Sequence, residues 1–195
     1  MFKPINLEYK DLNPYIDEEV INIQYNIYLD NLKKLNNLVK NEENKENIIK
    51  NIDKYPLLIR DDILYYVGSV LNHELYFNSI SNKKNNELKG KLKDEIIKEY
   101  GSFNNFKEKF IEAASYVVGS GYTFLVSDYN GKLNIINTSN EENPYYYDLI
   151  PIMTIDLWEH AYFLKYRLNK KQYIKDFFEI VDFDKINETY EKKIK

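Results

Sequence analysis

The sequence contains no cysteine and only two histidines among its 195 residues. The lack of cysteine excludes disulfides, a thiolate metal site and a cysteine nucleophile, and it fits a reducing compartment. Any bound metal must therefore be held by His, Asp, Glu or Tyr side chains. Because histidine is so rare in this chain, each imidazole is a candidate for a specific role.

The sequence also lacks a long apolar run. No run approaches the roughly 18 residues that a membrane span requires. The N-terminal residues MFKPINLEYK contain no apolar stretch of the kind found in a signal peptide. We therefore expect a soluble, cytoplasmic protein that does not associate with a membrane.

Concentrated positive charge is missing as well. The net charge is −4, and the lysines are dispersed among acidic residues. Because general affinity for nucleic acid depends on clustered Lys and Arg, we expect no nucleic-acid partner. The 44% hydrophobic content indicates a folded protein with a sizeable core.

The first part of the chain shows helical periodicity. Apolar residues at helical spacing predict a long helix over 17–40, with Asp17 as its N-cap. The polar segment 41–47 reads as a linker, and a second helix is predicted from Asp61 to Ser79. Together these segments predict an antiparallel helical hairpin.

The second part of the chain combines helical periodicity with the patterns typical of β-strands. Helices are predicted over 87–100 and 102–118, separated at Gly101, and Asn130-Gly131 predicts a β-hairpin. A third strand (149–157) and two further helices (158–168 and 171–181) follow. The predicted fold class is α+β: an N-terminal antiparallel helical hairpin (residues 1–84), then an α/β domain (residues 85–195) with a small three-stranded antiparallel sheet.

The two histidines lie in short segments with other polar groups. His73 lies in LNHELYF, and His160 lies four residues after Asp156 in DLWEHAY. An Asp and a His at this spacing can share one helix face, or can converge from a strand end and the following helix. Two imidazoles and one carboxylate suit iron or manganese. By spacing alone, a structural role for a histidine among aromatics is the more common alternative.

The segment DLWEHAY resembles the signature D-x-W-E-H-A-Y of the iron/manganese superoxide dismutase family. Other blocks of the chain resemble family segments in the same order. They are LEYKDLNPYIDEEVI near the N-terminus, LNHELYF, the central YGSFNNFKEKF and GSGYTFLV, and YIKDFFEIVDFD near the C-terminus. The resemblance covers nearly the whole chain and implies the family's two-domain fold.

The resemblance also implies an activity. Family members bind one iron or manganese ion per chain through three histidines, one aspartate and a solvent molecule, and convert superoxide to oxygen and hydrogen peroxide. Matched by motif, His73, Asp156 and His160 fall on three of the ligand positions.

The same motif implies a homodimer. Glu159 matches a glutamate that reaches across the dimer interface to the partner's metal-bound histidine, and Trp158 and Tyr162 belong to the same supporting group. Arg167 and Lys170 match basic side chains near the funnel that admits the superoxide anion.

The chain departs from the family pattern in its first helix. The pattern H-x-x-x-H-H-x-x-Y-V corresponds here to QYNIYLDNL, which is one residue shorter. The alignment leaves pairs of choices open: Gln24 or Ile23 for the ligand, Ile27 or Tyr28 for a gateway histidine, and Leu32 or Asn31 for a proton-delivering tyrosine.

The residues expected around the metal differ too. Glu141 and Ser69 occupy the two places where members carry a glutamine or histidine that hydrogen-bonds the metal's solvent. Tyr122 and Phe124 replace a pair of tryptophans. The loss of the glutamine removes a group that tunes the metal's redox potential.

Three functions remain open from the sequence. The first is a superoxide dismutase with an altered, impaired site, in which Gln24 or Glu141 substitutes for a ligand. The second is a non-catalytic homologue that serves as a dimeric structural or binding protein, with weak or no metal binding. The third is a different iron-dependent oxidation at open coordination positions. The three differ in metal content.

Overall fold

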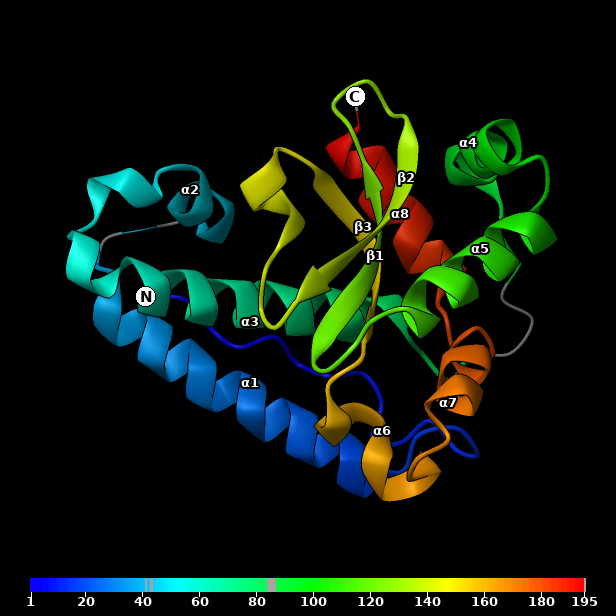
Figure 1. Ribbon diagram of the computed structural model, residues 1–195, viewed down its shortest axis with the longest axis horizontal. Helices are drawn as coiled ribbons and strands as arrows, with labels where there is room; N and C mark the ends of the chain where they lie inside the picture. The colour runs from blue at the N-terminus through cyan, green and yellow to red at the C-terminus, as the bar shows by residue number, and fades with distance from the viewer. Residues whose placement is uncertain (41, 43, 84–86, 195) are drawn as a thin grey trace.

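The computed structural model describes residues 1–40, 42, 44–83 and 87–194 (Figure 1). Two long helices, α1 (Glu18–Leu38) and α3 (Arg60–Ser79), lie side by side and run in opposite directions. The predicted helical hairpin is thereby confirmed. The predicted domain boundary between residues 84 and 85 lies outside the described residues.

The connection between α1 and α3 is more structured than predicted. A short helix α2 (Lys45–Lys50) and two 3-10 turns, η1 (Ile52–Lys54) and η2 (Leu57–Ile59), follow one another. The prediction of a linker over 41–47 is wrong at its end, because the Asn44 side chain accepts a hydrogen bond from the Glu46 amide and starts α2. Residues 41 and 43 lie outside the described part of the chain.

The helix break at Gly101 is confirmed. Helix α4 (Gly90–Tyr100) ends at this glycine, whose φ of 80° is the left-handed conformation that glycine adopts most readily. Ser102 then caps α5 (Phe103–Ser115), because its hydroxyl accepts a hydrogen bond from the Asn105 amide at 3.1 Å.

The sheet has three antiparallel strands, in the order β2-β1-β3. The turn between β1 (Gly121–Ser127) and β2 (Leu133–Ser139) contains Asn130-Gly131, as predicted. A 3-10 turn, η3 (Pro144–Tyr147), precedes β3 (Ile150–Asp156). In the β1–β3 register, Tyr122 stands opposite Asp156, so the end of β3 lies beside the start of β1.

The chain ends with three helices, α6 (Glu159–Tyr166), α7 (Lys170–Phe177) and α8 (Phe183–Lys193). The first two were predicted, but α8 was not. Its sequence is dominated by charged residues, and only Phe183, Ile186 and Tyr190 are buried along it. Their spacing of three and four residues is helical, which is the signal that could have identified α8.

The N-terminus of α1 differs from the prediction in one detail. Asp17 occupies the N-cap position, but its side chain makes no capping hydrogen bond. The carboxylate pairs instead with Lys165 of α6. This ion pair links the first helix to the segment that follows β3.

One hydrophobic core joins the two halves of the molecule. Buried residues of α1, α3, β3 and α7, among them Leu35, Ile63, Ile152 and Phe177, belong to the same cluster. Helix α3 packs on α1 and on β3 (Figure 1), so its side chains face both the hairpin and the sheet. Among the described residues, no helix has the length and apolar character needed to cross a membrane.

Candidate metal centre

Two imidazoles and one carboxylate meet where α3, β3 and α6 come together. His73 lies on α3, Asp156 is the last residue of β3, and His160 lies in the first turn of α6. Their potential ligand atoms all lie within 4.8 Å of one another. The Asp156–His160 spacing allowed either one shared helix face or a strand end that meets the following helix. The structure has the second arrangement.

Asp156 is at the centre of this cluster and is fully buried. Its Oδ2 lies 3.1 Å from Nε2 of His160 and 3.9 Å from Nε2 of His73. Its Oδ1 accepts a hydrogen bond from the Trp158 amide at 2.9 Å. The backbone of the strand–helix connection therefore orients the carboxylate.

His73 carries an unpaired nitrogen that points to a cation. Its Nδ1 lies 2.8 Å from the backbone oxygen of Ser69, which can only accept, so Nδ1 bears the proton and Nε2 a lone pair. Burial lowers the pKa of His73, which keeps the ring neutral. Nε2 is buried without a hydrogen-bond partner and faces a carboxylate oxygen. Two facing electron-pair donors fit a shared metal ion.

His160 and Asp156 each shift the pKa of the other. Burial disfavours the charge on His160, but the charge of Asp156 and its hydrogen bond outweigh burial and raise the pKa of His160. Burial alone would raise the pKa of Asp156, and the two imidazoles, His160 foremost, lower it instead. The His160 ring also stacks between His73 and Trp158, with each pair of centroids 5.8 Å apart.

The first helix presents Gln24, and not Ile23, to the cluster. Gln24 is fully buried, and its Nε2 donates a hydrogen bond to Oδ2 of Asp156 at 3.1 Å. Its Oε1 is buried without a partner. The alignment that places Gln24 at the first ligand position is therefore the one that matches the geometry.

The gateway-histidine and tyrosine positions of α1 carry side chains that make no hydrogen bond to the His73, Asp156 and His160 cluster. Tyr28 is buried, and its hydroxyl donates to Glu74 at 3.0 Å. Asn31 donates to the Ser69 hydroxyl at 2.8 Å, whereas Leu32 is buried and apolar. Helix α1 is continuous from Glu18 to Leu38.

Glu141 is buried behind the cluster and does not belong to the group of three ligand candidates. The Asn72 amide approaches its carboxylate at 3.4 Å, and Asn143 donates to Asn72 at 2.8 Å. Burial, followed by the charge of Asp156, raises the pKa of Glu141 to about 7. Gly68 makes room for this segment, because a Cβ there would lie 2.0 Å from the Glu141 carbonyl oxygen.

Two aromatic residues close the sheet side of the cluster. Tyr122 and Phe124 are fully buried, and the Tyr122 ring stands edge-on to His73 with centroids 6.4 Å apart. Both were expected to replace tryptophans. Their rings exclude water from this side of the site, where the Tyr122 hydroxyl is a buried polar group.

The remaining sequence-predicted residues lie along α6 and α7, outside the cluster. Glu159 is exposed in the first turn of α6, and Tyr162 stacks on Tyr173 with centroids 5.6 Å apart. Arg167 is exposed and lies over the Phe163 ring. Lys170 donates to the Val117 carbonyl oxygen at 3.1 Å, and burial lowers the pKa of its ammonium group.

Sequence reasoning missed four buried polar residues around the cluster: Asn72, Tyr76, Asn143 and Tyr173. Tyr173 donates to the backbone oxygen of Asp156 at 2.9 Å, and its hydroxyl lies 3.2 Å from that of Tyr76. Asn72 and Tyr76 flank His73 within the LNHELYF segment, which was the available signal. Nothing in the local sequence marks Asn143 or Tyr173 as its partners.

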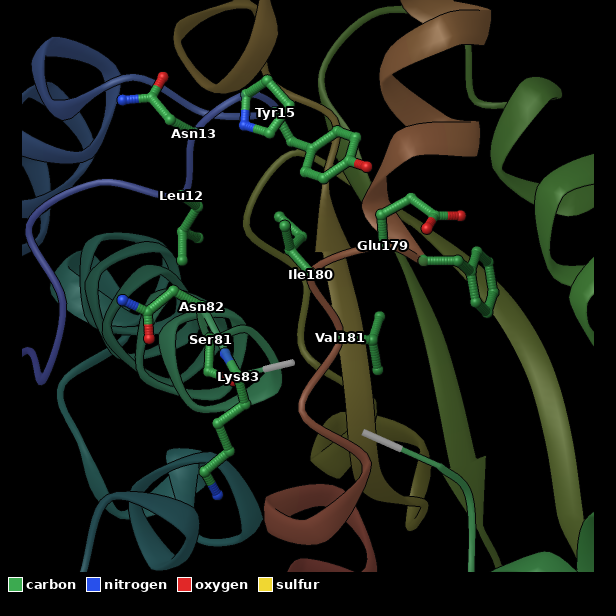
Figure 2. A pocket seen from close by; sticks show the side chains of 11 residues that line it. Leu12, Asn13, Tyr15, Ser81, Asn82, Lys83, Glu179, Ile180 and Val181 are labelled. Carbon is green, nitrogen blue, oxygen red and sulfur yellow. Dashed lines mark hydrogen bonds between the residues drawn. The ribbon is translucent and has the colours of Figure 1, made fainter. Parts of the chain in front are cut away.

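A surface cavity of about 570 Å³ lies elsewhere, between residues 12–15, 81–83 and 178–181. Figure 2 shows Tyr15 and Glu179 at one end of this cavity and Lys83 at the other. None of its lining residues belongs to the His73, Asp156 and His160 cluster.

Two imidazoles and a carboxylate buried between a helical hairpin and a small sheet are the donor set of a metal-binding protein. Residues 1–81 match the alpha-hairpin domain of the iron/manganese superoxide dismutases, and residues 88–189 match their C-terminal domain. The chain belongs to the iron/manganese superoxide dismutase family.

Individual relatives match along nearly their whole length. Superoxide dismutase [Mn] of Listeria ivanovii is 35% identical over 192 residues, which cover 94% of this chain and 93% of the relative. Superoxide dismutase [Mn/Fe] 2 of Staphylococcus aureus (strain bovine RF122 / ET3-1) is 36% identical over 197 residues, covering 97% and 98%. The names of these relatives indicate manganese, or manganese and iron.

Proposed function

We propose that this protein is a superoxide dismutase that uses one iron or manganese ion held by His73, Asp156 and His160. The observation that carries the proposal is the buried, unpaired Nε2 of His73, which faces Oδ2 of Asp156 at 3.9 Å. The names of the relatives support the choice of metal and substrate. When bound, the metal supplies one-electron oxidation and reduction of superoxide.

The protein's own residues orient the donors and exclude water. The Ser69 carbonyl fixes the tautomer of His73, and the Trp158 amide fixes the carboxylate of Asp156. The buried rings of Tyr122 and Phe124 exclude water from the sheet side. His73 and Asp156 are thereby held in place before a metal arrives, which favours binding.

We expect turnover to be slower than in a site with a tyrosine and a histidine on the first helix. Formation of hydrogen peroxide from superoxide consumes two protons. The Tyr28 hydroxyl donates to Glu74, and Asn31 donates to Ser69. Neither side chain offers an acidic proton to the cluster, so proton delivery is the step that we expect to limit the rate.

A homodimer in the cytoplasm is part of the proposal. Glu159 is exposed beside His160, where the family motif implies contact with a partner subunit. Phe163 and Leu164, on the same helix, are each 39% exposed. An acidic residue next to exposed apolar side chains suits a contact between two copies of the chain. The exposed Arg167 and the partly buried Lys170 are proposed to attract the superoxide anion.

A second candidate is a non-catalytic dimeric scaffold. The observation in its favour is that Oδ2 of Asp156 accepts hydrogen bonds from both Gln24 and His160. These bonds satisfy the carboxylate without a metal, so the cluster could be retained for structure alone.

Metal content and activity, measured on the same preparation, test the proposal. The protein should be expressed with added iron or manganese, analysed for both elements, and assayed for superoxide consumption. Close to one ion per chain with measurable turnover is the expected result. A chain that stays metal-free and inactive would support the scaffold instead.

The variant Gln24→His sharpens this test. An imidazole at this position would supply a third nitrogen donor, and we expect metal affinity to rise about 10- to 100-fold. Competition with a metal-binding dye measures the change, and Ile23→His, on the neighbouring face of α1, is the matched control. Equal gains from both variants would show that Gln24 does not face the metal.

A further inference from the structure

The turn between β1 and β2 contains the only Asn-Gly pair in the sequence, Asn130-Gly131. Asn130 is exposed at the tip of this turn, and asparagine is among the chemically labile residues of proteins. Glycine hinders a reaction at its own amide nitrogen least, because it has no Cβ. The pair therefore combines an accessible, labile side chain with an unhindered backbone amide.

The reaction open to this pair is deamidation through a cyclic imide. The backbone nitrogen of Gly131 attacks Cγ of Asn130, so that an N–Cγ bond forms while the bond from Cγ to Nδ2 breaks. The amide proton of Gly131 joins Nδ2, which leaves as ammonia. Water then opens the ring at either carbonyl and gives aspartate or isoaspartate at position 130. The protein and water are the only reactants.

Hydrogen bonds on both sides of the Gly131 peptide oppose this reaction. The Gly131 amide donates to the Asp128 carbonyl oxygen at 3.2 Å, at the long end of the normal range. The Gly131 carbonyl oxygen accepts a hydrogen bond from the buried Tyr190 hydroxyl of α8 at 2.9 Å. Because the reaction consumes the Gly131 N–H, the turn must open locally before the nitrogen can attack.

The C-terminal end of α8 lies against this turn (Figure 1). A Cβ on Gly131 would lie 3.0 Å from the Tyr190 hydroxyl and 3.1 Å from Cγ2 of Ile194. Opening of the turn therefore disturbs its contact with α8. Isoaspartate acts on the same contact, because it adds one atom to the backbone before Gly131 and displaces the carbonyl to which Tyr190 donates.

We propose that Asn130 is a site of spontaneous deamidation, that the docking of α8 through Tyr190 slows the reaction, and that isoaspartate at position 130 weakens this docking. Both effects arise from one contact, which opposes the opening of the turn and which the longer backbone of isoaspartate displaces. The inference depends neither on metal binding nor on the proposed function.

Peptide mapping by mass spectrometry tests the modification itself. The purified protein is incubated in mildly alkaline buffer, and deamidation is followed at Asn130 and at Asn78. Asn78 is exposed and precedes the small residue Ser79, but both lie within helix α3, so Asn78 is the internal reference. Aspartate and isoaspartate should accumulate at position 130 and not at position 78. No accumulation at position 130 would overturn the proposal.

Tyr190→Phe tests the role of α8. Loss of one buried hydrogen bond should make opening of the turn more frequent and speed deamidation of Asn130 about 5-fold. The matched control is Tyr9→Phe, which removes a buried hydroxyl that donates to the Phe77 carbonyl oxygen at 3.1 Å, in another part of the molecule. It should deamidate at the unmodified rate. No increase in Tyr190→Phe, or the same increase in both variants, would show that α8 does not slow the reaction.

Hydrogen exchange at the backbone amides of α8 tests the reverse effect. The isoaspartate form, separated by ion exchange after incubation, should exchange at least about 5-fold faster than the unmodified protein. The control is Asn130→Asp, which adds the charge without lengthening the backbone and should exchange as the unmodified protein does. Unchanged exchange in the isoaspartate form, or equal acceleration in Asn130→Asp, would overturn the proposed weakening of the α8 contact.

Discussion

The two sides of the cluster are built differently. On one side lies the α3–α6 wall (His73, Asp156 and His160), in which backbone groups hold two of the three donors: the Ser69 carbonyl holds His73 and the Trp158 amide holds Asp156. His160 is held by the Asp156 carboxylate. On the other, the α1 wall (Gln24, Tyr28 and Asn31) donates its hydrogen bonds to side chains, those of Asp156, Glu74 and Ser69. The fold itself therefore orients His73 and Asp156, and we expect the α1 wall to accept substitutions more readily.

This difference offers an explanation of how the chain can keep the family fold with Gln24 beside the proposed metal donors. A backbone contact persists when neighbouring side chains change, whereas a contact between side chains depends on both partners. We infer that the α3–α6 wall determines whether metal binds, and that the α1 wall tunes affinity and proton supply.

The largest expected effect comes from the α3–α6 wall. Asp156→Asn keeps the shape of the side chain but removes its charge, and metal affinity should fall by more than the roughly 100-fold that a change in a supporting residue can cause. Metal titration of the purified variant measures the loss. The matched control Asp94→Asn, on the exposed face of α4, should bind as the unmodified protein does. If Asp156→Asn retained its metal affinity, the inference that the α3–α6 wall determines metal binding would be wrong.

The next effect concerns the buried carboxyl of Glu141. Its pKa is raised from 4.5 to about 7 in the folded protein, so the folded state holds more protons than the unfolded state between these values. Stability of the metal-free protein should therefore fall as pH rises from 4.5 through 7, by up to about 3 kcal/mol.

Glu141→Gln should abolish this part of the pH dependence. Urea unfolding of the metal-free protein at pH 5 and pH 8 measures it, and Glu142→Gln, at the exposed neighbouring position, is the control. A variant with the same loss of stability between the two pH values as the unmodified chain would contradict the assignment.

A smaller effect is expected where α3 meets the Glu141 segment. A Cβ at residue 68 would lie 2.0 Å from the Glu141 carbonyl oxygen, so Gly68→Ala must displace this backbone. We expect a loss of about 1–3 kcal/mol in the free energy of unfolding. Thermal or urea unfolding measures it, with Asn78→Ala on the exposed face of α3 as the control. An equally stable Gly68→Ala would show that the two segments are not in close contact.

Much of the fold was predictable because its signals are local. The periodicity of 17–40 and 61–79, Gly101 with Ser102, and Asn130-Gly131 each act within a few residues. Helix α8 was missed because its three buried residues are outnumbered by charged ones. The start of α2 was missed because Asn44 caps it within a segment whose composition is that of a linker.

The surroundings of the metal donors were less predictable, because they depend on contacts across long stretches of sequence. Gln24 and Asp156 are 132 positions apart, and Tyr76 and Tyr173 are 97 apart. The sequence did not decide whether Gln24 or Ile23 occupies the first ligand position. The folded structure decides it, because Gln24 lies on the side of α1 that faces β3 and α6. Sequence motifs located His73, Asp156 and His160, but not the tyrosines behind them.

The most direct test of the central claim is anomalous X-ray scattering from crystals grown with manganese. The data should be collected on both sides of the manganese absorption edge. We predict one strong anomalous peak per chain, bounded by His73 Nε2, Asp156 Oδ2 and His160 Nε2. A peak at another place in the molecule, or no peak in protein shown to be folded, would contradict the account.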